Sequence, residues 1–496
     1  MLMLGKGVQA PEVTLPKSIK LDYRCHLTED LEPSYQLVIL DRTPDCDECA
    51  LLQPVTQAHT LFFTEYVQPS MCEEFLMRKL GKKLKSTDIP RFLQEEALWF
   101  FSGSYGEKFL MENLAVSRNF SGEVYWHGSY ALQLTGEFGE NLSQIAFWRN
   151  QIPVETGQTL DLWLEYHKTP GVEISLQGIL FEPGQLCKVL QTWEFSQEDL
   201  DHILHIRAEK KGHLFVSLNA KGSGSLDILA LHDRYSRGKY GYFIPGGERY
   251  VTSKREEIFC YFHPGDLKPP LCVYFSGYKT RQGFEGYNMM QGLGVPFLLI
   301  TEARLEGGGF YLGSEEYERL MAQIIQRHMD LIGFSKDEVI LSGISMGSSG
   351  ALYYGCDLTP HAVIAGKPLL NMGTIARNEK RNRPGGFPTS LDVLLVHGGD
   401  TTDEAADQLD RRFWDKFDKT DWSKTKLVLS YMLEDDYDMH AYEMMLWALS
   451  DKNAQIYGRG IHGRHNDNTV GIVQWFVSQY KKILQEDFPQ SNREFR

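Results

Sequence analysis

Apolar residues change their spacing twice along the chain, and each change predicts a new structural unit. Residues 1–118 combine two short apolar runs, YQLVILDR and TLFFTEYV, with helix-like repeats in SMCEEFLMRKLGKKL and IPRFLQEEALWFF. Short apolar runs favour strands, and apolar positions three to four residues apart favour helices. We therefore expect a small α/β domain over residues 1–118.

Residues 119–236 instead alternate apolar and polar positions in short runs that Gly, Pro and polar turns separate. Leu160, Leu162, Leu164 and Tyr166 share one face, and VEISLQ and HLFVSLNA show the same alternation. Successive side chains of a strand point to opposite faces, so many short runs of this kind predict a β-sandwich. The pattern is similar to that of carbohydrate-binding modules.

The same alternation places Trp163 on the polar face of its strand, beside Asp161 and Glu165. An exposed indole can stack on the apolar face of a sugar ring. The alternative, which we favour, is that a neighbouring domain covers this tryptophan.

The segment RYSRGKYGYFIPGGERY, residues 234–250, is rich in Gly, Arg and Tyr and is predicted to be a linker. Beyond it, over residues 237–496, strand-like runs such as PPLCVYFSG and VPFLLITEARL alternate with amphipathic repeats such as SEEYERLMAQIIQRHMDLIG. This order predicts a parallel sheet with helices on both faces. The fold class is therefore α/β, with a β-sandwich between two α/β units.

Composition narrows the classes of partner and the location. Lys and Arg number 51 against 66 Asp and Glu, a formal charge of −15, which disfavours binding to nucleic acid or anionic lipid. No apolar run reaches the length of a signal peptide or a membrane span, so we expect a cytosolic protein. The CDEC sequence at 46–49 lacks a second cysteine pair, which favours an ordinary loop over a metal or redox site.

Residues 339–355, VILSGISMGSSGALYYG, hold a Gly-X-Ser-X-Gly pattern between a strand-like run and a helix-like run of small residues. This is the strand, turn and helix of a nucleophile elbow in α/β-hydrolases. Gly343 and Gly347 suit the sharp turn, which leaves no room for side chains at those positions. We predict that Ser345 is a nucleophile; the alternative is one serine in a glycine-rich turn.

A serine nucleophile needs a histidine base oriented by an acid, and α/β-hydrolases place them in the order Ser, acid, His. The loop GIHGRHNDN before the final amphipathic segment offers two histidines. We prefer His465, because Asn466 and Asp467 beside it can cap the following helix. His462 is the second candidate.

The acid is expected in KLVLSYMLEDDYD, a strand-like run that ends in several carboxylates. Glu434 and Asp435 are favoured because they follow the last strand before the histidine, where a carboxylate can reach the far imidazole nitrogen. Asp436 and Asp438 lie further into the loop. Asp400, at the end of LDVLLVHGGD, is a rival.

An oxyanion hole needs two backbone N–H groups, one from the residue after the nucleophile and one from the loop after an earlier strand. Met346 can supply the first, and the loop around Gly277 and Tyr278 the second. The EGGGFYLG stretch, residues 306–313, can form a pocket wall or a flexible turn.

Four stretches, LSGISMGSSGALYYGCDL, AGKPLLNMGTIA, SYMLEDDYD and GRHNDNTVGIVQWF, carry a family resemblance. The chain resembles the second accessory secretory proteins of the accessory Sec system, which exports serine-rich-repeat glycoprotein adhesins from Gram-positive bacteria. The resemblance implies an α/β-hydrolase-like catalytic domain that O-acetylates N-acetylglucosamine on the adhesin and supports its export. It also implies Ser345 and His465 as catalytic residues, and a glutamate as the acid. This favours Glu434, although the register can also place Asp435 there.

The resemblance further implies partners: the first and third accessory secretory proteins, the accessory Sec motor ATPase and the serine-rich-repeat glycoprotein substrate. It allows peripheral membrane association through the translocon. No bound cofactor or metal is expected, and the acetyl donor stays open. A carbohydrate esterase has the same chemistry as an acetyltransferase, and a non-catalytic scaffold of the export machinery is the alternative from another class.

Overall fold

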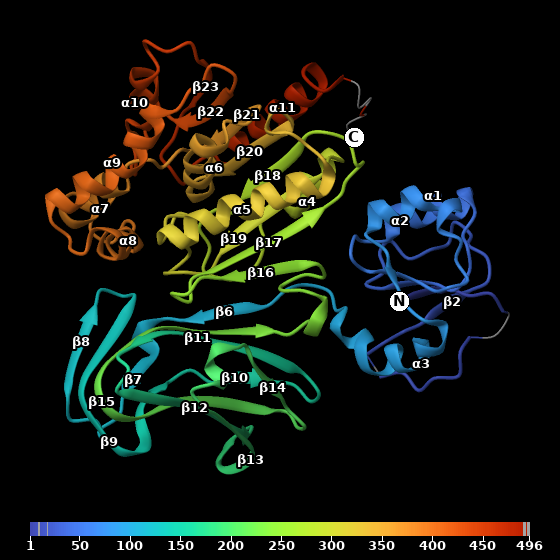
Figure 1. Ribbon diagram of the computed structural model, residues 1–496, viewed down its shortest axis with the longest axis horizontal. Helices are drawn as coiled ribbons and strands as arrows, with labels where there is room; N and C mark the ends of the chain where they lie inside the picture. Colours follow the sequence, from blue (N-terminus) through green and yellow to red (C-terminus); the bar gives the residue numbers. More distant parts are fainter. Residues whose placement is uncertain (8–9, 17, 490–492, 494–496) are drawn as a thin grey trace.

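The computed structural model describes residues 1–496 except 8–9, 17, 490–492 and 494–496. It contains three sheets that follow one another along the chain (Figure 1). The first and third are accompanied by helices and the second is antiparallel. The mixed α/β character expected from the sequence is confirmed, and the domain limits at residues 118 and 236 stay predictions.

The first sheet has five parallel strands in the order β2-β1-β3-β4-β5. In β1, Leu2 and Leu4 pack into one apolar cluster and Met3 into another, so both faces of the sheet are covered. The elements are β1 (Leu2–Leu4), β2 (Asp22–Arg24), β3 (Val38–Leu40), α1 (Cys46–Val55), β4 (Leu61–Phe63), α2 (Glu73–Lys79), β5 (Lys82–Lys83) and α3 (Ile89–Arg91).

The second sheet gathers ten strands around a single apolar core. The alternation predicted for residues 160–166 is confirmed, since all four apolar side chains of that run lie in this core. The strands are β6 (Gly106–Phe109), β7 (Leu114–Val116), β8 (Glu123–His127), β9 (Ala131–Trp148), β10 (Ile152–Val154), β11 (Thr159–Lys168), β12 (Val172–Glu182), β13 (Gln185–Phe195), β14 (Leu204–Arg207) and β15 (Gly212–Tyr235).

The third sheet has eight strands in the order β16-β17-β19-β18-β20-β21-β22-β23. The first three pair antiparallel and the rest parallel. Its strands are β16 (Gly247–Val251), β17 (Glu257–His263), β18 (Leu271–Phe275), β19 (Phe297–Glu302), β20 (Val339–Ile344), β21 (Ala362–Gly366), β22 (Lys426–Met432) and β23 (Gln455–Ile461).

Helices cover both faces of this third sheet. Side chains of α5, α6, α7, α8, α9 and α10 join the apolar cluster on one face, and those of α4 and α11 join the cluster on the other. The helices are α4 (Tyr287–Leu293), α5 (Glu315–Ile332), α6 (Met346–Leu358), α7 (Met372–Arg381), α8 (Thr389–Gly398), α9 (Asp403–Lys419), α10 (Ala441–Ala448) and α11 (Thr469–Glu486). None of the helices in the described ranges is long and apolar enough to cross a lipid bilayer.

Residues 234–250 are not the open linker that their composition predicts. The segment ends β15, begins β16 and between them buries Arg237, whose Nε donates to the Phe243 carbonyl at 2.8 Å. The same guanidinium donates to the carbonyls of Trp99 and Phe101. The segment is therefore a packed joint where the three sheets meet.

Trp163 is 3% exposed, because the third sheet covers the polar face of β11. The guanidinium groups of Arg249 and Arg255 lie over its ring at 4.1 and 4.0 Å. The favoured alternative, coverage by a neighbouring unit, is confirmed, and the ring is no platform for a sugar.

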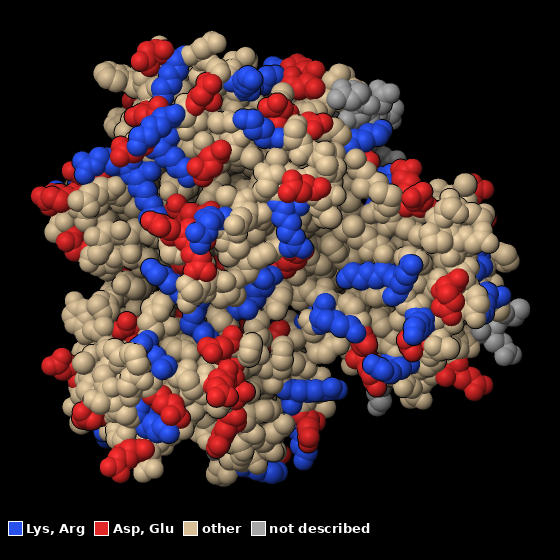
Figure 2. Space-filling view, in the orientation of Figure 1, with Lys and Arg blue, Asp and Glu red and all other residues tan. Residues whose placement is uncertain are grey.

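Charged side chains of both signs lie beside one another across the face that Figure 2 shows. All eight cysteines, including Cys46 and Cys49 in the first turn of α1, are free thiols.

Candidate active site

Ser345 occupies the sharp turn between β20 and α6, with φ 56° and ψ −123°. A non-glycine residue pays a steric cost for positive φ, and such strain persists only where the surrounding structure fixes it. Here the flanking glycines make the turn possible. A Cβ on Gly343 would lie 2.1 Å from the Gly347 carbonyl oxygen, and one on Gly347 would lie 2.1 Å from that of Phe275.

Three side chains from distant parts of the chain form a hydrogen-bonded series at this turn. The Ser345 Oγ lies 2.9 Å from His465 Nε2, and His465 Nδ1 lies 2.9 Å from Asp435 Oδ2. His465 and Asp435 are both buried, with side chains 4% and 5% exposed. Water therefore competes little with these two contacts.

The surroundings of Asp435 determine which histidine nitrogen carries the proton. Its Oδ1 accepts the backbone N–H groups of Tyr437 and Asp438, at 2.9 and 3.1 Å, which leaves Oδ2 for His465. A carboxylate only accepts hydrogen bonds, so Nδ1 carries the proton and the Nε2 lone pair faces Ser345. Burial alone would raise the pKa of Asp435, but its contacts with His465 and the two backbone amides lower this pKa by more. The net result is a pKa below the ordinary value for Asp.

The structure brings Asp435, and not the preferred Glu434, to His465. Glu434 instead contacts His462 Nδ1 at 3.0 Å and the N–H of Gly463 at 2.6 Å, with side-chain exposures of 52% for Glu434 and 86% for His462. The backbone N–H of Glu434 still donates to the carbonyl of Gly463, just beyond the edge strand β23. Asp435 is the next residue and lies past this backbone pairing, where its side chain reaches His465.

The other acidic candidates do not contact the imidazole. Asp400 is exposed and caps the start of α9 through Thr402. Asp436 accepts the backbone N–H of His465 at 3.1 Å, and its carboxylate also pairs with Arg383. Asp438 is buried and accepts the N–H groups of Leu370 and Asn371, so it holds a neighbouring loop.

Lys367 supports the histidine loop and was not expected from the sequence. It is 3% exposed, and its Nζ donates to the carbonyls of His465 and Asp467 at 2.5 and 3.0 Å. The pKa of this amine is lowered by burial. The sequence signal around it, AGKPLL, follows β21 directly, at the same strand end as Ser345 and Asp435.

The two backbone N–H groups predicted for the oxyanion hole differ in whether they already donate a hydrogen bond. Met346 is the first residue of α6, where backbone N–H groups have no acceptor within the helix and the helix dipole favours negative charge. The Gly277 N–H, in contrast, donates to Glu285 Oε2 at 2.5 Å. An oxyanion could take this second donor only if it displaced the Glu285 carboxylate.

The EGGGFYLG stretch is held by hydrogen bonds and close packing, and its role as a pocket wall stays a prediction. The N–H groups of Gly309 and Tyr311 donate to buried Glu302 Oε1 at 2.9 and 2.8 Å. A Cβ on Gly308 would meet the Met346 side chain, and one on Gly307 would meet the Tyr278 ring. The stretch therefore lies against both predicted oxyanion segments.

Aromatic rings line the space beside this stretch. Phe387 packs edge-on against Tyr278, Phe310 and Tyr437, with ring centroids 5.4 to 5.7 Å apart. Tyr437 in turn packs against the His465 ring at 4.7 Å. The ring contacts of Tyr437 hold the His465 imidazole in place.

The family model described as the accessory Sec system GspB-transporter matches residues 17–490. The chain belongs to this family. An accessory Sec system protein of Streptococcus gordonii is 37% identical over 499 residues, 98% of each chain. One of Staphylococcus aureus is 42% identical over 389 residues, which cover 78% of this chain and 74% of the relative. The resemblance noted in the sequence is confirmed.

A solved structure extends this likeness to the whole fold. A chain of the Glycosylation Associate Protein complex from Streptococcus agalactiae has a TM-score of 0.88 and 34% identity, and the match covers 98% of both chains. The arrangement of three sheets is therefore shared with a member of a protein complex.

Proposed function

We propose that this accessory Sec system protein is a serine-dependent O-acetyltransferase with an α/β-hydrolase-like catalytic domain. Its substrate would be N-acetylglucosamine on serine-rich-repeat glycoproteins, whose export it would also support. The observation that carries the proposal is the series Ser345, His465, Asp435 at a strained turn between a strand and a helix. Nucleophile, base and acid in this relation are the parts of acyl transfer through a serine.

The first half of the reaction acylates the enzyme. His465 Nε2 takes the proton of Ser345 while Oγ attacks the carbonyl carbon of the acetyl donor, and Asp435 stabilises the imidazolium that forms. The Met346 N–H stabilises the oxyanion of the tetrahedral intermediate. The intermediate then collapses as the bond to the leaving group breaks, and His465 gives that group its proton. An acetyl ester on Ser345 remains.

The second half transfers the acetyl group. His465 removes the proton of a sugar hydroxyl, whose oxygen attacks the ester carbonyl. The bond to Ser345 Oγ breaks, and the serine takes the proton back from His465. If water attacks in place of the sugar, the same residues act as an esterase, so the identity of the acceptor distinguishes the two activities.

The experiment compares wild-type, Ser345→Ala and Ser102→Ala proteins. Ser102 is an exposed serine far along the chain from the site and serves as the matched control. We expect a fluorophosphonate probe to label the wild-type and control proteins but not Ser345→Ala, and mass spectrometry to find acetylated adhesin glycans only with the first two. Labelling without acetylation would favour the esterase, and a wild-type protein that resists the probe would favour the scaffold.

The proposal extends to partners. The similar solved chain comes from the Glycosylation Associate Protein complex, which supports the view that this chain also works in a complex, and the family resemblance implies the first and third accessory secretory proteins as its partners. The motor ATPase and the glycoprotein substrate follow from the family resemblance. Copurification of the tagged chain with these proteins tests the assignment, and Ser345→Ala should copurify with them as well as wild type does.

A further inference from the structure

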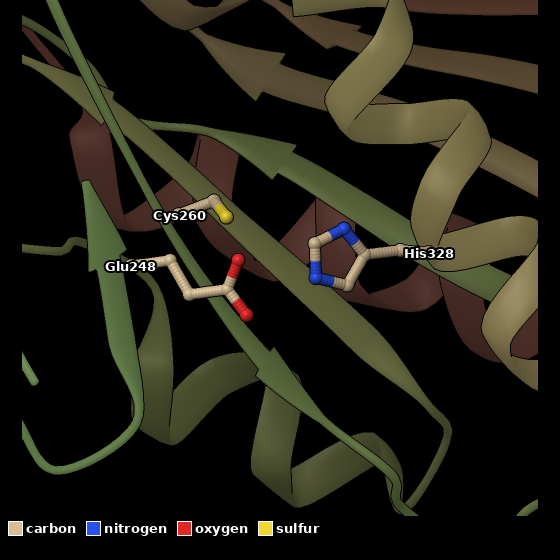
Figure 3. A group of neighbouring side chains, drawn as sticks. All are labelled: Glu248, Cys260 and His328. Atoms are coloured by element: carbon tan, nitrogen blue, oxygen red, sulfur yellow. The ribbon is translucent and has the colours of Figure 1, made fainter. Parts of the chain in front are cut away.

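A second group of reactive side chains lies at the far edge of the third sheet. Glu248 on β16 and Cys260 on β17 are directly opposite each other in the antiparallel pair, so their side chains share one face. That face is covered by α5, which contributes His328. Figure 3 shows the three side chains converging, and one ligand atom of each lies within 4.8 Å of the others.

Hydrogen bonds to the main chain prepare His328 as a ligand. Its Nδ1 lies 2.8 Å from the carbonyl oxygen of Ile324, which can only accept, so Nδ1 carries the proton. The Nε2 lone pair then faces the carboxylate of Glu248 (Figure 3). Metal-binding histidines commonly have their second nitrogen held in this way.

Glu248 is oriented in a comparable manner. The hydroxyl of Tyr250 and the guanidinium of Arg327 both donate to Oε2, at 2.5 and 2.8 Å. These contacts hold one carboxylate oxygen, and Figure 3 shows the carboxylate of Glu248 lying between Cys260 and His328. The Glu248 side chain is 37% exposed, so an ion can enter from solvent, while Cys260 is fully buried.

A second cluster of three possible ligands in the chain differs from this one in how many of its ligand atoms are already paired. Glu165, His232 and Glu257 also lie close together. There, however, Arg234 and Arg249 occupy the Glu257 carboxylate, and both nitrogens of His232 have partners. In that group both oxygens of Glu257 and both nitrogens of His232 are therefore occupied by other side chains.

We propose that Glu248, Cys260 and His328 bind a divalent ion of the zinc class. One oxygen, one sulfur and one nitrogen donor suit a borderline-soft ion, and water can complete the tetrahedron from the exposed side. Ligand atoms about 2.0–2.3 Å from zinc lie roughly 3.5 Å apart, so side-chain shifts of about 1 Å close the site. Binding forms the metal–sulfur bond and releases the thiol proton to solvent.

The location indicates a structural role. Strands β16 and β17 form one edge of the sheet, whereas β22, which leads to Asp435, and β23 form the other. An ion bound here would join α5 to the edge of the sheet and would not take part in chemistry at Ser345.

The test is a titration of the metal-free full-length protein with Co²⁺, an optical substitute for Zn²⁺. We expect one Co²⁺ per chain, a thiolate-to-cobalt charge-transfer band, and loss of the band on addition of Zn²⁺. Cys260→Ala should lose the band. Glu248→Gln, on a half-exposed side chain that folding tolerates, should weaken Co²⁺ binding at least about 10-fold.

Two controls use other cysteines. Cys272→Ala removes a fully buried thiol from the same sheet, and Cys46→Ala/Cys49→Ala removes the exposed Cys46 and the partly buried Cys49 of α1. Both should keep the band. No band in the wild-type protein, or its loss in the Cys46/Cys49 variant, would overturn the assignment. If Cys260→Ala does not fold, equal Co²⁺ affinity in Glu248→Gln and wild type would overturn it as well.

Discussion

Replacing Asp435 with Asn changes one oxygen to nitrogen and should disable the imidazole. The amide oxygen can still accept the N–H groups of Tyr437 and Asp438, which places the amide nitrogen against His465 Nδ1. Two N–H donors cannot bond each other, so His465 moves its proton to Nε2. That proton then points at Ser345 Oγ, and the ring can no longer accept the serine proton.

The expected loss is large and specific to this position. Changing the acid of such a series to its amide lowers turnover about 10⁴-fold, or about 5 kcal/mol of transition-state stabilisation. Glu434→Gln alters a solvent-exposed pair with His462 and leaves the contacts of His465 unchanged, and solvent strongly weakens such exposed pairs. We therefore expect Glu434→Gln to change turnover by less than about 2-fold.

The assay is hydrolysis of a small acetyl ester by Asp435→Asn, Glu434→Gln and Asp400→Asn, with melting temperatures measured alongside. Asp435→Asn should melt within a few degrees of wild type, since burial and the backbone contacts are retained. A loss in Glu434→Gln as deep as that in Asp435→Asn would refute the reasoning, because it would mean that the acid reaches the imidazole by another route. Collapse in Asp400→Asn alone would do the same.

Three further outcomes follow from the structure. Gly347→Ala should destabilise the fold by about 1–3 kcal/mol, since its Cβ would lie 2.1 Å from a carbonyl oxygen. Gly292→Ala, whose Cβ would have no atom within 4 Å, should stabilise the fold by about 0.5–1 kcal/mol. Melting temperatures check both predictions. Burial lowers the pKa of His59 from 6.5 to about 4. Between these pH values the unfolded chain takes up a proton at His59 and the folded chain does not. The free energy of unfolding should therefore fall as the pH falls through this window. His59→Gln should lose less stability between pH 7 and pH 4.5 in denaturant titrations, and an equal loss would contradict the assignment. Lys367→Met should lower kcat for ester hydrolysis about 10²-fold with little change in KM, because the loop that positions His465 loses its anchor.

The sequence predicted those features of the site that depend on local geometry. The turn at Ser345 needs Gly343, because a Cβ there would meet the Gly347 carbonyl within the same motif, so the motif alone is informative. His465 could be chosen because it lies between a strand and a helix that both have clear patterns. Neither inference needs knowledge of how distant segments meet.

Features that depend on distant segments could not be predicted in the same way. Whether Glu434 or Asp435 reaches His465 depends on where the chain stops pairing along β23, and both residues carry the same charge. The cover on Trp163 comes from arginines about 90 residues later in the chain. The Glu285 carboxylate accepts the Gly277 N–H because the loop between these residues turns back on itself. The pattern of apolar and polar residues does not specify the path of this loop.

That loop also links the proposed chemistry to the second sheet. Gln282 donates its backbone N–H to Gly106 and its side-chain amide to Glu107, and it accepts from Arg234, whose guanidinium is paired with buried Glu257. The segment that carries Gly277 is thus held by strands β6 and β15 as well as by its own sheet. Removing one partner of a buried charge pair typically costs several kcal/mol, so deletion of residues 1–236 would disturb the site and not merely detach a neighbouring unit. Export and the proposed acetylation should therefore be separated with point changes such as Ser345→Ala, since truncation also removes contacts that hold the segment carrying Gly277.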